Sequence, residues 1–303
     1  MSVSAWTRRT RETGTELRHL PVARGVATAG IVATAGRCLR RPRAGLLAGL
    51  AAGLVEASIL DRLAGLARDV RNAEDAALLA PMLAPADMPL GTWAAEPDFL
   101  RLLVAELSRD PGGVVELGSG ASTVLMAAVR RWRGGPPVIS VDHDPDFARK
   151  TRATLAQAGL EEHAHIHVAP LEQISVDGQE MVWYDRDEME RVLPDQIDLL
   201  VVDGPPSRTR LARWPAVELL STRLSDRCVV LLDDGRRRDE TATALRWARR
   251  HPNLALFWHD TVKGTWRLEA TSQADGRAMQ LARRGIRSID THPTGFGRWS
   301  VRR

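Results

Sequence analysis

The chain has 303 residues, 44% of them hydrophobic and 26% charged, which is enough for a domain of about 150–200 residues with its own core and an extension. The formal net charge is +4 and the isoelectric point about 9.8. However, the arginines are dispersed and only 5% of the residues are aromatic, so a nucleic-acid-binding protein is disfavoured. The two cysteines, Cys38 and Cys228, lie far apart, which excludes a disulfide framework or a cysteine-rich zinc site and fits a reducing compartment.

Residues 1–85 are rich in alanine, glycine and arginine, and helical spacing of their apolar residues predicts a helical extension. The apolar run at residues 44–60 is rich in alanine and glycine and contains Glu56, whereas a spanning helix needs about 20 strongly apolar residues. A helix that packs on the rest of the chain or on a second subunit, as in a homo-oligomer, is therefore favoured, with peripheral membrane association as the alternative. Pro81, Pro85 and Pro89 then predict a linker.

From residue 93 onward, short apolar segments alternate with amphipathic ones. Such alternation predicts parallel strands joined by right-handed helical crossovers. The last two strands are joined by too short a link to be parallel, so they predict an antiparallel hairpin. The expected fold is a doubly wound α/β domain with a mostly parallel, seven-stranded sheet. The predicted strands are 114–117, 138–141, 165–168, 197–202, 229–232, 254–258 and 265–268, and the predicted helices are 122–132, 146–158, 208–220 and 239–250.

The first predicted strand runs into the sequence Glu-Leu-Gly-Ser-Gly-Ala-Ser-Thr at residues 116–123. Gly118 and Gly120 suit a sharp turn whose backbone passes close to a ligand, and ligands of open α/β sheets bind at the carboxyl ends of the strands. A dinucleotide site would need glycine or alanine where Thr123 stands. Glu116 would repel a pyrophosphate, but it suits a ligand that carries a cationic amino or sulfonium group.

This pattern resembles the S-adenosylmethionine-binding motif of class I methyltransferases. The second strand ends at Asp142, whose carboxylate can accept hydrogen bonds from both ribose hydroxyls, as the ribose-binding acid does in that family. The resemblance also implies that the loop after the third strand edges the adenine ring. The cofactor-binding residues it implies are Glu116, Gly118, Ser119, Gly120, Ser122, Thr123, Asp142, His143, Ala169, Pro170 and Leu171.

Acidic residues follow the fourth and fifth predicted strands, at Asp203 and at Asp233 and Asp234. In enzymes similar to catechol O-methyltransferase, acids at these places bind a divalent cation, so the resemblance implies a Mg²⁺ site formed by these three carboxylates. Carboxylates brought together repel one another and favour a hard cation. Without a metal, Asp203 is the candidate catalytic residue, as a general base or as the group that orients one.

The sequences Val-Asp-His-Asp at 141–144 and Val-Asp-Gly-Pro-Pro at 202–206 are most similar to a bacterial O-methyltransferase branch. The function expected is S-adenosylmethionine-dependent O-methylation of a small-molecule or saccharide acceptor in the cytoplasm. A nicotinamide-dependent oxidoreductase and a non-catalytic cofactor-binding protein stay open as alternatives. The expected division is a helical extension at 1–85, a methyltransferase domain at 86–270 and a C-terminal extension at 271–303.

Overall fold

The computed structural model describes residues 42–86, 95–206 and 210–270. The chain divides into two compact units, with the boundary between Glu74 and Asp75. The first contains most of helix α3 (Pro42–Leu83), and the second contains the end of α3 and every strand described. The predicted C-terminal extension, residues 271–303, lies outside the described residues, and the predicted domain boundaries stay predictions.

Helix α3 confirms that the described part of the extension is helical. The prediction that a linker begins at Pro81 is wrong, because α3 continues through Pro81 to Leu83 and a 3₁₀ helix follows at Ala84–Ala86. Pro81 removes one backbone hydrogen bond from α3, because proline has no N–H, but it does not end the helix. Pro89 lies outside the described residues. In the described part of the chain, no helix is both long and apolar enough to span a membrane.

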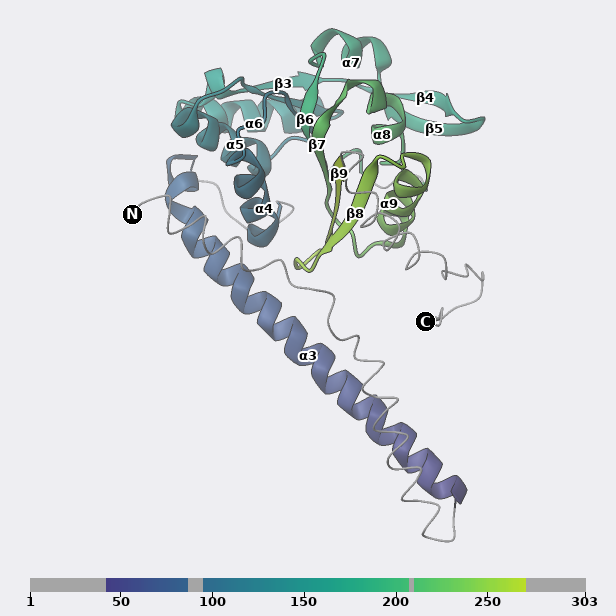
Figure 1. Ribbon diagram of the computed structural model, residues 1–303. Helices are drawn as coiled ribbons and strands as arrows, with labels where there is room; N and C mark the ends of the chain where they lie inside the picture. The colour runs from purple at the N-terminus through teal and green to yellow at the C-terminus, as the bar shows by residue number, and fades with distance from the viewer. Residues whose placement is uncertain (1–41, 87–94, 207–209, 271–303) are drawn as a thin grey trace. The chain divides into compact units, whose positions relative to one another are not determined.

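The second unit is built on the predicted mostly parallel, seven-stranded sheet (Figure 1). Its strand order is β3-β2-β1-β6-β7-β9-β8, and β9 pairs antiparallel with both β7 and β8. Every residue of the central strands β1 and β6 is buried, as expected for strands covered on both faces. The strands are β1 (Val114–Leu117), β2 (Val138–Asp142), β3 (Ala164–Val168), β6 (Ile197–Val202), β7 (Leu224–Leu232), β8 (Leu254–His259) and β9 (Thr265–Ala270).

Helices cover the two faces of this sheet, with α4, α5 and α6 on one side and α8 and α9 on the other (Figure 1). Local signals set several of their ends: the Asp144 carboxylate accepts hydrogen bonds from the first backbone amides of α6, and Gly159 ends that helix with a positive φ. The helices are α4 (Pro97–Leu107), α5 (Ala121–Arg133), α6 (Pro145–Ala158), α7 (Arg186–Val192), α8 (Pro215–Leu220) and α9 (Arg238–Arg250), with 3₁₀ helices at Glu161–His163 and Ser221–Arg223.

The predicted helix at residues 208–220 is wrong in length, since only α8 from Pro215 to Leu220 is helical. Leu211 has a positive φ of 58°, which a right-handed helix cannot contain. Pro215 instead occupies the first turn of α8, where its missing amide costs nothing. Residues 207–209 lie outside the described part of the chain.

Between β3 and β6 the chain forms a separate two-stranded hairpin, β4 (Leu171–Val176) and β5 (Gln179–Tyr184), followed by α7. The turn is Asp177-Gly178, and both residues have a positive φ, as a type I′ hairpin turn requires. Trp183 and Tyr184 at the end of β5 are buried in the same apolar cluster as Leu117 and Val202 of the sheet. The hairpin therefore completes the core on the face that α8 and α9 cover.

Candidate active site

The predicted glycine loop leaves the carboxyl end of β1 and leads into α5. Gly118 has a φ of +97°, and its amide donates a hydrogen bond to the Val141 carbonyl at 2.7 Å. A Cβ at Gly118 would lie 3.2 Å from the Gly204 amide nitrogen. This glycine is thus required by the protein's own backbone, because a side chain there is both strained and crowded. At Gly120, by contrast, a Cβ would meet nothing within 4 Å.

Buried hydroxyl groups hold the glycine loop in place through hydrogen bonds on its core side. The Thr123 hydroxyl accepts a hydrogen bond from the Gly120 amide at 2.9 Å and donates to Oε2 of Glu116 at 2.5 Å. The Ser140 hydroxyl donates to the same oxygen at 2.8 Å. Burial raises the pKa of Glu116 to about 7, although these hydroxyl groups and Ser122 act in the opposite direction. Glu116 and Thr123 therefore shape the loop from inside the core, where both are fully buried.

Asp142 is brought to the same loop from the end of β2. Its Oδ2 accepts hydrogen bonds from the Ser119 amide at 2.9 Å and the Ser119 hydroxyl at 2.6 Å. Its Oδ1 accepts from the Asp144 amide at 3.0 Å and lies 3.4 Å from Nδ1 of His143. A carboxylate oxygen accepts more than one hydrogen bond, so Asp142 is held in place and still has acceptor capacity for a ligand hydroxyl.

The predicted adenine loop adjoins Asp142 through the backbone, because the Ala169 amide donates to the Asp142 carbonyl at 2.8 Å. The Pro170 carbonyl accepts a hydrogen bond from the Asp185 amide, also at 2.8 Å, and Leu171 pairs with Tyr184. The hairpin therefore fixes this loop on its far side. Ala169 is buried, Leu171 is half-buried and Pro170 is exposed.

Tyr184 projects from the hairpin toward the place where the glycine loop meets Gly204. The side chain is fully buried, and its hydroxyl has no hydrogen-bond partner among the described residues. A Cβ at Gly204 would lie 2.4 Å from that hydroxyl, and one at Gly118 would lie 3.5 Å from the Gly204 Cα. Burial and the nearby carboxylate of Asp142 raise the pKa of Tyr184 well above its ordinary value. From the sequence, Tyr184 belongs only to a segment, residues 176–194, that could shape a substrate pocket; the Asp-Gly turn and its flanking apolar residues signal the hairpin that carries it.

The three predicted acids meet at the carboxyl ends of β6 and β7. Ligand oxygens of Asp203, Asp233 and Asp234 all lie within 4.8 Å of one another. Asp203 has 31% of its side chain exposed, whereas Asp233 and Asp234 are buried. Neither carboxylate oxygen of Asp233 has a hydrogen-bond partner in the part of the chain that the structure describes. Burial, reinforced by the charge of Asp203, raises the pKa of Asp233 well above its ordinary value.

Arg213 neutralises part of this charge from inside the core. Its guanidinium donates hydrogen bonds to Oδ1 of Asp203 at 3.2 Å, to Oδ2 of Asp234 at 3.0 Å and to the Asp233 carbonyl at 3.1 Å. Only 4% of the side chain is exposed. Burial lowers the pKa of Arg213, but the surrounding carboxylates, Asp203 foremost, outweigh it and raise the pKa overall. Arg237 adds a second, half-exposed cation 2.8 Å from Asp234. The sequence carried no signal for Arg213, which lay inside a predicted helix and away from any strand end.

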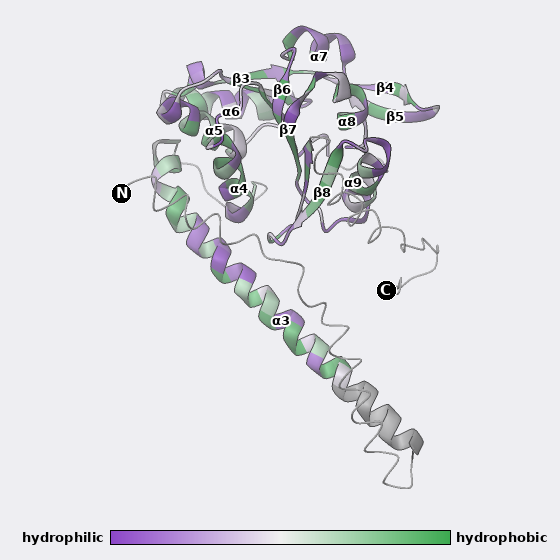
Figure 2. Cartoon of the chain, in the orientation of Figure 1, coloured by the Kyte–Doolittle hydropathy of each residue, from purple (hydrophilic) through white to green (hydrophobic). Residues whose placement is uncertain are grey.

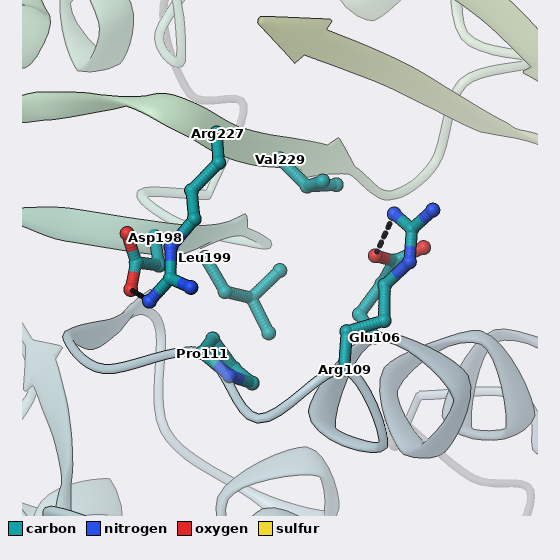
Figure 3. Close-up of a pocket in the computed structure, with 7 residues that line it drawn as sticks. All are labelled: Glu106, Arg109, Pro111, Asp198, Leu199, Arg227 and Val229. Carbon is teal, nitrogen blue, oxygen red and sulfur yellow. Dashed lines mark hydrogen bonds and ion pairs between the residues drawn. The ribbon is translucent and has the colours of Figure 1, made fainter.

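A small cavity of about 50 Å³ lies elsewhere in the domain (Figure 3). Figure 3 shows the Asp198–Arg227 and Glu106–Arg109 ion pairs on opposite sides of it. Asp198 and Leu199 belong to the amino-terminal half of β6, whereas the predicted site residues gather at the carboxyl ends of the strands. This cavity is therefore separate from the candidate active site.

Comparison with known proteins agrees with this arrangement. Residues 115–235 match a protein-family model described as a methyltransferase domain. No curated protein sequence matches the chain.

Similar solved structures include cofactor-bound Rv0187 from MTB, at 19% identity over 67% of this chain and 96% of that one, with a TM-score of 0.49. An O-methyltransferase from Bacillus cereus in complex with SAH is 12% identical over 64% and 90% of the two chains, with a TM-score of 0.47. The O-methyltransferase TomG from Streptomyces achromogenes, in complex with SAM, is 16% identical over 66% and 90%, with a TM-score of 0.43. The family match covers the glycine loop, Asp142 and all three clustered acids, and the sheet has the parallel strands and the antiparallel hairpin that the sequence predicts. Residues 115–235 therefore belong to a methyltransferase domain, built on a mostly parallel, seven-stranded sheet.

Proposed function

We propose that this protein methylates an oxygen atom of a small-molecule or saccharide acceptor, with a divalent cation held by Asp203, Asp233 and Asp234. The observation that carries the proposal is the contact between Gly118 and the Asp203-Gly204 segment. It joins the loop expected to hold the cofactor to the carboxylates expected to hold the acceptor. Since S-adenosylmethionine is a cytosolic metabolite, we expect the domain to work in the cytoplasm.

The chain's own residues would position the two reactants, which supplies much of the rate in such a transfer. Asp142 would accept hydrogen bonds from the ribose hydroxyls, with Ser119 holding its carboxylate in place. Ala169 to Leu171 would edge the adenine ring. S-adenosylmethionine supplies an electrophilic methyl group on a sulfonium. Without a bound cation, Asp203, the most exposed of the three acids, would orient the acceptor hydroxyl and take its proton as the oxygen–methyl bond forms and the sulfur–methyl bond breaks.

The acid cluster fits a cation. Three carboxylates offer oxygen ligands of the kind that Mg²⁺ prefers, and both buried carboxylate oxygens of Asp233 lack a protein partner among the described residues. Arg213 pairs with Asp203 and Asp234, and Arg237 pairs with Asp234. The positive charge of Lys263 also acts on Asp203 and Asp233. When bound, such a cation lowers the pKa of an acceptor hydroxyl and holds its oxygen.

The oxidoreductase alternative is not favoured. The position where a dinucleotide site needs a small residue is filled by Thr123, whose hydroxyl is committed to Glu116 and to the Gly120 amide. Replacing this threonine with the glycine or alanine of a dinucleotide motif would remove that link.

Replacing Asp142 with alanine is expected to weaken S-adenosylmethionine binding about 10- to 150-fold, because a charged acceptor for two hydroxyls is worth about 1.5–3 kcal/mol. Calorimetric titration of the purified variant measures this. Asp144→Ala is the matched control: that carboxylate lies in the same loop but caps α6, so its loss should lower stability and leave affinity within about threefold of the wild type. Equal affinities of Asp142→Ala and the wild-type protein would contradict the ribose assignment.

The cation is tested separately, with Mg²⁺ itself as the probe. S-adenosylmethionine should bind with and without Mg²⁺, because its predicted contacts do not include Asp233. In the presence of the cofactor, Asp233→Asn is expected to weaken Mg²⁺ binding at least about tenfold, since it removes one charged ligand. Absence of cofactor binding would overturn the methyltransferase proposal. Normal cofactor binding without any Mg²⁺ binding would overturn only the proposed cation site.

A further inference from the structure

Four large apolar side chains follow one another along α3 and are all exposed: Ile59, Leu63, Leu66 and Val70, which we call the α3 seam. Between 52% and 61% of each is exposed. Figure 2 shows hydrophobic residues recurring between hydrophilic ones along this part of α3. The seam lies wholly within the first compact unit. Helices of this kind owe most of their stability to tertiary packing of an apolar face, so an exposed seam indicates a surface that another element covers.

The spacing of the α3 seam fits a helix of a second copy of the chain. The intervals from Ile59 to Leu63, Leu66 and Val70 are alternately four and three residues, which places these residues at successive d and a positions of a heptad repeat. A two-stranded coiled coil is built on this repeat, although the apolar stripe of an ordinary amphipathic helix has the same spacing over so short a length. Ala73 continues the repeat by one further position, and Glu56 interrupts it at the other end. The seam is thus short and bounded.

The charges beside the α3 seam distinguish the two directions in which a second copy could lie. Arg62 and Asp69 occupy the g positions that flank it, and Glu74 occupies an e position. In a parallel pair, Asp69 would face Glu74 of the partner subunit, and two acids would repel. In an antiparallel pair, g positions face g positions, so Arg62 would face Asp69 of the partner subunit and the reverse pair would form by symmetry. Ile59 would then pack on Val70 of the partner subunit, and Leu63 on Leu66 of the partner subunit.

We propose that the α3 seam is a dimerisation surface, through which two copies of this chain form an antiparallel two-stranded coiled coil centred between Leu63 and Leu66. A two-fold axis at that point makes the contact isologous, so that the assembly closes at two copies. The surface contains none of the residues assigned to the cofactor or the acid cluster, and the proposal does not depend on the reaction proposed above.

A charge-swap experiment on the full chain tests both the dimer and its direction. Sedimentation equilibrium should show a reversible dimer for the wild-type protein. Arg62→Asp and Asp69→Arg should each raise the dissociation constant about tenfold, because each creates two like-charge pairs in place of two ion pairs. The double variant R62D/D69R should restore the wild-type value. Restoration is specific to the antiparallel register, since only there do these two positions face each other.

Matched variants separate the seam from the rest of α3. Leu66→Asp should give a monomer with unchanged S-adenosylmethionine binding. Leu54→Asp should leave the dimer intact, because Leu54 is equally apolar and 73% exposed but lies off the seam. A monomeric wild-type protein at every concentration would overturn the proposal, whether residues 1–41 or a lipid vesicle then covers the seam. A dimer strengthened by Asp69→Arg would overturn the antiparallel direction, and one unaffected by Leu66→Asp would overturn the surface.

Discussion

Arg213→Met is expected to lower the free energy of unfolding by about 3–5 kcal/mol, the usual cost of removing one partner from a buried ion pair. Methionine keeps most of the side-chain volume, so the effect reports the lost charge and hydrogen bonds instead of a cavity. The guanidinium joins Asp203, Asp234 and the Asp233 carbonyl, and without it the clustered carboxylates lose their buried counter-charge. Urea denaturation followed by circular dichroism measures the loss.

Arg237→Met is the control for this variant. Arg237 also pairs with Asp234, at 2.8 Å, but 54% of its side chain is exposed, so its removal should cost no more than about 1 kcal/mol. Arg213→Lys, which keeps the charge but not the planar fork of donors, should fall between the two. If Arg213→Met unfolds at the same urea concentration as Arg237→Met, the cluster does not depend on the buried guanidinium.

Gly118→Val is expected to abolish measurable S-adenosylmethionine binding and to lower stability by about 1–3 kcal/mol. Valine at a φ of +97° is strained, and its Cβ would press on the Gly204 amide at 3.2 Å. The loop can escape that contact only by moving away from Gly204, which would also displace Ser119 from Asp142. Calorimetric titration, on protein whose fold circular dichroism confirms, measures binding.

Gly120→Ala distinguishes a loss of affinity caused by contact with the cofactor from one caused by backbone strain. Its Cβ would meet nothing within 4 Å, and its φ of 163° is ordinary extended backbone. Stability should therefore stay close to that of the wild-type protein, and any loss of affinity would report a cofactor that passes over Gly120. A folded Gly118→Val protein that binds S-adenosylmethionine normally would show that this loop does not form the cofactor site.

The order of strands and helices was largely predictable, because each buried parallel strand is a short apolar run that is followed by a loop with glycine or acidic residues. Asp142, Asp203 and Asp233 could be placed at one edge for the same reason. The β4–β5 hairpin was not predicted, since its residues alternate weakly and the domain's usual pattern has no strands there. Only the Asp177-Gly178 turn marks it. Helix α4 was missed as well.

The interior of the site was much less predictable than its outline. The contact of Arg213 with acids from two different loops depends on where an irregular turn, with Leu211 at positive φ, directs the chain. Tyr184 reaches Gly204 only through the tertiary placement of the hairpin. The hydrogen bond from Thr123 to Glu116 in the core was not predicted either, and the roles of these two residues as ligand contacts stay predictions. Neither the motif nor the spacing carries such information.

The strand order also determines when this sheet can form during synthesis. Val114 of β1 pairs with Leu199 of β6, so one side of the first strand has no partner until the ribosome has made most of the domain. The final strand, β9, inserts between β7 and β8, and the sheet is complete only when residue 270 has emerged. Strand pairs between segments far apart in the sequence form slowly, and the apolar edges of the strands stay unpaired until they do. A nascent chain interrupted before β6 would therefore expose an apolar parallel edge, making it a substrate for chaperones or a seed for aggregation.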